Sequence, residues 1–414
     1  MKDSGISWVG EIPKEWSVNR AKYCFVNTKE IAGCMSDRYE RLALTMNGVI
    51  KRSKDDSNGL QPEKFETYQI LRPDELVFKL IDLQNVSTSR VGLSPYLGLV
   101  SPAYIILKSN KRVLPAFAEK YFLMLWKNQI FNALGDAGVR SNLNSKDLLE
   151  LSIPFPTFDE QQQIADFLDR ECGKIDGLKA DIQAQIDTLE QYKRSVITEA
   201  VTHGLNPSAP MKDSGIPWVG QFPTHWTKKK GKYILRYMSK PVKQDDGVIT
   251  CFRDGEVTLR SNRREDGFTM ADKEIGYQGV DVGDLVVHGM DGFAGAIGIS
   301  DSRGKASPVL NVLNTKQNKK YIMYYLRSMA YGEVFTALST GIRVRSCDLR
   351  WNKLAELLYP LPPIDEQNNI VSYIDNQIAR TNEIIADKKS QIETLDGYKK
   401  SLIYEYVTGK KEVV

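Results

Sequence analysis

The 414-residue sequence has few of the residues that build metal sites, disulfide frameworks or membrane spans. Its three histidines are scattered and share no spacing typical of metal ligands. Its five cysteines form no CxxC pair, which argues against a disulfide framework or a zinc ribbon and fits a reducing cytoplasm. No apolar run approaches the about 20 residues of a membrane span, and the first residues lack the apolar core of a signal peptide. We therefore expect a cytoplasmic protein without a metal site.

Motifs of nucleotide-dependent and cofactor-dependent enzymes are missing as well. There is no GxxxxGK[ST] loop for ATP, no Asn-Pro-Pro-aromatic or Asp-Pro-Pro-aromatic methylase segment, and no strand–GxGxxG–helix unit. Asp74 and Glu75, followed by Lys79, superficially resemble part of a nuclease site, but a separate upstream acid at a plausible spacing is lacking. We predict no catalytic site and no cofactor. A stand-alone nuclease or methyltransferase and a coiled-coil scaffold without DNA contact are the two rival classes.

An internal repeat covers the whole chain. The opening MKDSGISWVG returns as MKDSGIPWVG at Met211, ELVFKLID aligns with DLVVHGMD, PFPTFDEQ with PLPPIDEQ, and YKRSVITEAVT with YKKSLIYEYVT. The offset stays between 206 and 210 residues throughout. Such a period is far longer than a solenoid repeat, so one unit of a domain and a helix is written twice.

Each copy divides into a mixed α/β part and a long helix. The first part is punctuated by Gly, Pro, Asn and Asp, with short apolar strands such as LVFKLI and VLNVL. A Pro-x-Pro segment follows, and Asp159 or Asp365 can cap the helix after it. We predict an α+β chain of two similar domains and two long helices. The predicted segments are residues 1–158, 159–205, 206–364 and 365–414.

Apolar residues recur every seven positions in both predicted helices, which favours a coiled coil. Because the chain holds two such helices, we expect them to pair with each other. In the first helix the main series is Leu168, Ile175, Ile182, Leu189 and Val196, with Leu178 and Tyr192 as companions and Glu171 and Gln185 as interruptions. In the second it is Val371, Ile378, Ile385 and Ile392, with Ile374, Leu395 and Leu402 as companions and Thr381 and Lys388 as interruptions.

Charge separates along the same segments. The two α/β parts carry net charges of +4 and +7, whereas the two helical parts carry −5 and −2. A polyanion would be attracted to the former and repelled by the latter. This distribution favours nucleic-acid binding by the α/β parts over a scaffold without DNA contact.

Four features together resemble the specificity subunits of type I restriction–modification systems. They are the MKDSGIxWVGxxPxxW opening at Met1 and Met211, the GVR and GIR segments at Gly138 and Gly341, the Pro-x-Pro…DEQ helix entry, and the tandem repeat itself. Each motif alone is weak, but their duplicated order is specific and covers essentially the full length.

The resemblance implies a division of labour between domains and helices. Two target recognition domains would each read one half of a split, asymmetric DNA site, and an antiparallel coiled coil would set the gap between the halves. The helices would also dock two modification subunits, which methylate adenine with S-adenosylmethionine. Two restriction subunits would add ATP- and Mg²⁺-dependent translocation and cleavage. The chain itself would be non-catalytic.

Candidate base-reading residues in the first domain lie in the stretch from Lys79 to Arg90. Gln and Asn can bond adenine in bidentate fashion, and Arg can do the same with guanine. A polar surface turn is the alternative interpretation. The predicted DNA-binding residues are Lys79, Gln84, Asn85, Ser87 and Arg90.

Candidates in the second domain fall into two segments. HGMDGFAG places His288 where the first copy has Lys79, and its small residues would let the backbone approach a partner closely. CFRDGEVTLRSNRRED is a basic cluster in which phosphate contact is favoured over base reading. Tight turns and a solvated basic face are the alternatives. The predicted residues are Arg253, Arg260, Arg263, Arg264, His288 and Asp291.

Two further candidates precede the Pro-x-Pro segments. Arg140 in GVRSNL could bind a phosphate, and either Arg343 or Arg345 in GIRVRS is its counterpart, because the second copy has three extra residues here. Ion pairing inside the domain is the competing interpretation.

Four tryptophans occupy equivalent places in the two copies: Trp8, Trp16, Trp218 and Trp226. Domains that read different sequences would not share an identical pair of base-stacking residues, but they would share packing. We therefore predict that these tryptophans anchor the core.

Overall fold

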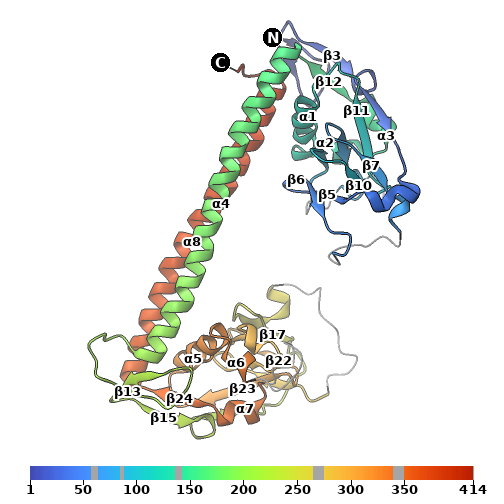
Figure 1. Cartoon of the computed structure of the whole chain (residues 1–414). Coiled ribbons are helices and arrows are strands. Elements are labelled where there is room, and N and C mark those ends of the chain that lie inside the picture. The colour runs from blue at the N-terminus through green and yellow to red at the C-terminus, as the bar shows by residue number, and fades with distance from the viewer. Residues whose placement is uncertain (57–63, 84–87, 136–141, 264–274, 339–348, 414) are drawn as a thin grey trace. The chain divides into compact units, whose positions relative to one another are not determined.

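The computed structural model describes residues 1–56, 64–83, 88–135, 142–263, 275–338 and 349–413 (Figure 1). The chain forms two compact units, one of Met1–Ile182 with Lys389–Val414 and one of Gln183–Lys388. Each unit holds one α/β domain and one half of each long helix, so the units divide the chain differently from the four predicted segments. No helix in the described part is long and apolar enough to cross a membrane.

The central sheet of each domain has the same strand order and is antiparallel throughout. In the first unit the order is β4-β11-β8-β9, and in the second it is β16-β23-β20-β21. The middle strands read LVF and LVVH and are buried on both faces, as a strand under covering helices must be. The bounds are β4 Phe25–Thr28, β8 Leu76–Phe78, β9 Val91–Leu93, β11 Ile105–Ser109, β16 Leu235–Tyr237, β20 Leu285–His288, β21 Ile297–Ile299 and β23 Leu310–Thr315.

The second layer of strands differs between the domains. The first has a four-stranded sheet, β6-β5-β10-β7, whose β5–β10 pairing is parallel. The second has a hairpin, β17-β18, and a separate pair, β19-β22, joined through an isolated parallel bridge between Val248 and Lys305. The bounds are β5 Arg41–Thr45, β6 Gly48–Arg52, β7 Gln69–Leu71, β10 Gly98–Val100, β17 Ile249–Cys251, β18 Val257–Leu259, β19 Gln278–Val280 and β22 Gly304–Ala306.

Three helices and two small strand pairs recur in both domains. Helix α1 and its counterpart α5 are the most buried, and their aromatic and aliphatic side chains form the centre of each core. The helices are α1 Pro115–Lys127, α2 Ile130–Leu134, α3 Ser145–Glu150, α5 Lys319–Tyr331, α6 Val334–Ala337 and α7 Trp351–Glu356. The strand pairs are β1 Lys2–Asp3 with β2 Glu11–Ile12, β3 Ser17–Arg20 with β12 Ser152–Phe155, β13 Met211–Asp213 with β14 Gln221–Pro223, and β15 Thr227–Lys230 with β24 Leu358–Leu361.

The two long helices, α4 Phe158–His203 and α8 Ile364–Val407, lie side by side in both units (Figure 1). In the first unit Lys179 bonds Asp396 and Lys399 bonds Asp176, both across the pair. In the second, Lys193 bonds Asn382. Residue numbers rise along one helix as they fall along the other, so the pairing is antiparallel. The predicted coiled coil is confirmed.

The predicted seam is right for α8 and half wrong for α4. In α8 the companion positions Ile374 and Thr381 are buried. In α4, however, the predicted companions Leu178 and Tyr192 are 53% and 47% exposed. The true companions lie one residue further along, at Cys172, Lys179, Ile186, Lys193 and Ala200. The error arose because two seam positions are lysines, whose apolar stems are packed while their ammonium groups reach the other helix.

The predicted core role of the tryptophans is confirmed by equivalent hydrogen bonds in the two units. Trp8 donates to the Tyr121 hydroxyl at 3.1 Å, and Trp218 donates to Tyr325 at 2.9 Å. The other pair joins domain and helix. Trp16 donates to Glu160 at 3.2 Å and Trp226 to Glu366 at 3.0 Å.

The glutamine of the DEQ motif completes this joint. Gln161 is 1% exposed, donates to the Pro156 carbonyl and accepts the Leu114 N–H. Gln367, fully buried, makes the same two bonds with Pro362 and Asn318. A buried amide so satisfied holds the long helix in one orientation on its domain. The repeated motifs are therefore structural.

Candidate nucleic-acid interface

A cleft of about 630 Å³ in the second domain brings the two predicted segments together. The hairpin β17-β18 and the residues that follow it form one wall, and the end of β20 with the turn after it forms the other. All the described candidates of this domain line the cleft: Arg253, Arg260, Arg263, His288 and Asp291. Segments more than 20 residues apart in sequence thus meet at one edge of the domain.

Ion pairs, a hydrogen bond and a ring contact fix the arginines around the hairpin. Arg263 bonds Asp254 at 2.6 Å and Glu256 at 2.9 Å, and its guanidinium lies 4.2 Å from the centre of the Phe252 ring. Burial would raise the pKa of the Asp254 carboxyl, but the hydrogen bond from Arg263 brings that pKa below its usual value. Arg260 donates to the Thr250 hydroxyl at 3.3 Å. These cations are therefore oriented before any ligand arrives.

His288 is held as a neutral ring that caps the turn after β20. Its Nδ1 accepts the backbone N–H of Met290 at 3.2 Å and of Asp291 at 2.9 Å, so the ring proton is on Nε2. Burial, together with nearby Arg253, lowers the pKa of His288. Asp291 in turn binds Arg253 at 3.0 Å, with 36% and 62% of their side chains exposed. The cleft thus offers donors beside an exposed carboxylate acceptor, the mixture that base edges require.

The first domain places its described candidates differently. Arg90 is fully buried, and its guanidinium donates to the Asp82 carbonyl at 2.6 Å. In this structure the Arg90 guanidinium braces the loop, so Arg90 favours the alternative of a structural role, and its predicted DNA contact stays a prediction. Lys79 donates to Thr88 at 3.3 Å, and burial and the charge of Arg90 lower the pKa of Lys79.

The remaining candidates lie outside the described residues. The DNA-contact predictions for all the described candidates stay predictions. The backbone N–H of Leu143 donates to the Leu80 carbonyl, and the backbone N–H of Leu349 donates to the Gly289 carbonyl. These equivalent bonds agree with the predicted alignment of the two copies at Leu143 and Leu349. The candidates that lie outside the described residues are Gln84, Asn85, Ser87, Arg140, Arg264, Arg343 and Arg345.

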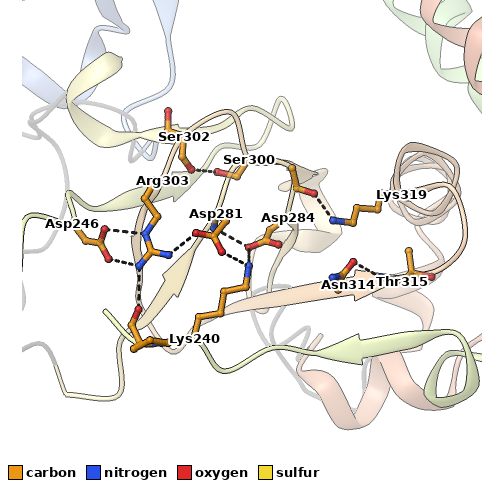
Figure 2. A network of polar contacts seen from close by, with 12 residues as sticks. Lys240, Asp246, Asp281, Asp284, Ser300, Ser302, Arg303, Asn314, Thr315 and Lys319 are labelled. Atoms are coloured by element: carbon orange, nitrogen blue, oxygen red, sulfur yellow. Dashed lines mark hydrogen bonds and ion pairs between the residues drawn. The ribbon is translucent and has the colours of Figure 1, made fainter. Parts of the chain in front are cut away.

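Other charges of the second domain are consumed internally (Figure 2). Arg303 bonds Asp246 and Asp281, and Lys240 bonds Asp281 and Asp284. Hydrogen bonds from Lys240 and Arg303 lower the pKa of Asp281 to about 2. Glu75, which the nuclease comparison singled out, accepts the backbone N–H of Arg72 and is 3% exposed. These groups are paired with one another or with the backbone of their own turns.

Thr250 and Phe252 line the cleft, and sequence reasoning missed both. Thr250 lies between the buried Ile249 and Cys251, so the alternation of the strand points it to the other face. The Asp254-Gly255 turn, with Gly255 at φ +90°, was the available sign of a hairpin here. Within the described residues, no group of three or more His, Cys, Asp or Glu side chains is placed to hold a metal ion.

Comparisons with known proteins find similarity to type I specificity subunits. A family model described as the type I restriction modification DNA specificity domain matches residues 81–188. The putative type I restriction enzyme MjaX specificity subunit of Methanocaldococcus jannaschii is 22% identical, over 98% of this chain and 96% of its own length. The resemblance to type I specificity subunits is confirmed.

A solved structure from a type I system has the same fold as this chain over nearly its whole length. It comes from a study of complex assembly and conformational transition of the type I R-M system, with a TM-score of 0.67 and 11% identity. The match covers 97% of this chain and 100% of that one. The fold of two α/β domains with two long helices is therefore shared with that structure across both units.

Proposed function

We propose that the chain is the DNA-reading subunit of a type I restriction–modification complex and binds a bipartite, asymmetric site, one half per domain. It acts in the cytoplasm, has no catalytic role of its own and uses no cofactor. Its partners are double-stranded DNA, two modification subunits and two restriction subunits. S-adenosylmethionine, ATP and Mg²⁺ belong to those partners.

The observation that carries the proposal is one frame with two different reading edges. The central sheets, tryptophan hydrogen bonds and helix joints are the same in both domains, whereas the turn after β8 in the first domain differs from the turn after β20 in the second. There Lys79 stands in place of His288, and Arg90 in place of Ala296. A shared frame with altered edges supports two half-sites of different sequence.

The helices support a role in spacing. Helix α4 has 46 residues, which at 1.5 Å per residue gives a length of about 70 Å. Its seam is packed and bridged to α8 in both units. The DNA duplex repeats roughly every 34–36 Å. A helix pair of fixed length between the two domains would therefore restrict the gap between the two half-sites.

Long-read methylome sequencing of the host with and without this gene tests the bipartite site directly. We expect a split adenine-methylated motif that disappears with the gene. A continuous motif, or an unchanged methylome, would contradict the proposal.

A second experiment tests the role of the helices. Removing one heptad from each helix, residues 179–185 and 389–395, should change the spacer and keep both half-sites. Altered half-site bases with an unchanged spacer would contradict this role.

A further inference from the structure

A second pocket of the Gln183–Lys388 unit lies between the long helices and the domain. Its volume is about 820 Å³, and it is lined by α4, α8, α5 and the residues around α6. Arg253 and Asp254 line both this pocket and the cleft described above, so the two are neighbours. The cationic side chains on its wall are Lys193, Arg194, Arg253 and Arg327.

The helix contributes to this pocket through a motif that occurs in both copies, Tyr-Lys-Arg-Ser at 192–195 and Tyr-Lys-Lys-Ser at 398–401. The first basic residue is used to pair the helices. Lys193 bonds Glu190 and Asn382, both at 2.8 Å, and Lys399 bonds Asp176 at 2.7 Å. Helix pairing therefore explains the first basic residue and leaves the second unexplained.

Arg194, the second basic residue, is exposed and lies over the ring of Tyr331 at 5.3 Å. Among the described residues it has no ion-pair partner. A useful comparison is Arg170 of the same helix, which lies over Phe167 at the same 5.3 Å but also bonds Glu171 at 2.9 Å. Stacking positions the Arg194 guanidinium and leaves its hydrogen-bond donors available.

The other pocket charges leave a surplus of guanidinium groups. Lys193 binds Glu190 and Arg253 binds Asp291, while Asp254 is bound by Arg263. Arg327 donates to the Asp254 carbonyl, and within the described structure its buried Nε has no hydrogen-bond partner. Glu333 is the remaining carboxylate of the wall. Guanidinium groups gathered in a groove suit a phosphodiester, which accepts their forked donors in pairs.

We propose that this pocket binds a phosphate of the DNA backbone beside the half-site read by the second domain, with Arg194 as its helix-borne anchor. Arg327 and Arg253 complete the site, and the backbone runs from the pocket into the neighbouring cleft. The inference rests on the proposed function. It gives α4 a direct part in DNA binding, although the helical segment as a whole is acidic.

The test uses the complex of the chain with its modification subunits and two fluorescent duplexes, one with the methylated motif and one without. Arg194→Gln should weaken binding to both duplexes by about fivefold and reduce the slope of log Kd against log salt by about one. The methylated motif should stay unchanged, because a phosphate contact carries no base information. Arg194→Lys should recover part of the loss, and the matched control Arg170→Gln should behave as wild type.

Methylphosphonate substitution, which removes one backbone charge at a time, locates the contact. One substitution beside the second half-site should weaken binding by the wild-type complex and have no effect on Arg194→Gln. If Arg194→Gln binds like Arg170→Gln at every salt concentration, the inference fails while the proposed function stands. Loss of modification-subunit assembly in Arg194→Gln would show a protein-docking site and overturn it. Failure of the wild-type complex to prefer its motif would instead reject the proposed function.

Discussion

The two α/β domains share a central sheet and a joint to a long helix, and they differ in the strands and turns around them. Both have the same central strand order, the same tryptophan–tyrosine bond and the same tryptophan–glutamate joint to a long helix. They differ in the second layer of strands and in the turn that follows β8 or β20. The parts that dock on a helix are constant, and the parts away from that joint vary. The variable parts can therefore change without disturbing the joint.

The same contrast appears in the turns themselves. Glu75 and Asp284, each 3% exposed, both accept a backbone N–H three residues earlier. Beyond this shared turn the solutions diverge. In the first domain Asn142 accepts the Asp82 N–H, whereas in the second the ring of His288 caps the equivalent turn. Equivalent backbone needs are thus met by unrelated side chains.

The largest expected effect is on the shared frame. Trp226→Ala and Trp16→Ala should each destabilise their own unit by about 3–5 kcal/mol, because both remove a buried indole. Hydrogen exchange, followed unit by unit, measures the effect. Trp→Phe at either position keeps the ring volume in part and should cost less. Unequal losses at the two positions would break the equivalence of the joints.

The next effect separates the true seam of α4 from the predicted one. Ile186→Ala should cost about 2–4 kcal/mol because Ile186 is 5% exposed, whereas Leu178→Ala should cost under about 0.5 kcal/mol at 53% exposure. Urea unfolding followed by helical circular dichroism compares them. Equal costs would mean that the helices pair in another register.

A charge network distinguishes the second domain from the first. Arg303→Gln should cost about 2 kcal/mol at pH 7 by leaving the nearly buried Asp246 without its partner. In the first domain Arg72 pairs with Glu30 with 43% and 47% of the side chains exposed, so Arg72→Gln should cost under about 1 kcal/mol. Exchange protection of each unit measures both.

Acid should remove the Arg303 contribution. The hydrogen bond from Arg303 lowers the pKa of Asp246, and Lys240 together with Arg303 lowers the pKa of Asp281 from 3.8 to about 2. This stabilisation is complete above pH 3.8 and is lost as pH falls toward 2. The gap between wild type and Arg303→Gln should therefore narrow over that interval. A gap that stays constant down to pH 2 would show that charge is not its source.

The smallest and most local effect concerns reading. His288→Lys, which installs the residue of the first copy, should weaken or alter recognition of one half-site by about 1–3 kcal/mol and leave the other unchanged. His288→Asn keeps an acceptor for the turn and serves as the control for loop collapse. Competition binding with single-base variants of each half-site is the measurement. Equal effects on both half-sites would contradict the assignment of one half to each domain.

Much of the frame was predictable because repetition reveals packing. The duplicated tryptophans predicted core anchoring and the DEQ segments predicted the start of a helix, and the structure shows hydrogen bonds of both motifs in both units. The α8 seam was predictable because its series is mostly apolar. The α4 seam was not, since Lys179 and Lys193 occupy half-buried seam positions, with their stems packed and their ammonium groups bonded to α8. Polarity alone does not separate such a lysine from a solvated one.

The candidate site was predictable in its residue types and not in its grouping. The cluster at Arg253 and the turn at His288 were recognised separately, and the fold of the second domain brings them to one cleft. Arg90 had the same sequence appearance as Arg253, yet it is buried and bonds the backbone of Asp82.

Local pattern was enough to establish the duplication, the two paired helices and the core role of the tryptophans, because these depend on periodicity and on volume. Which arginines face outward, and which distant loops meet, depended on the folded chain. An exposed and a buried guanidinium differ in desolvation and in partners, and those are supplied by segments remote in sequence.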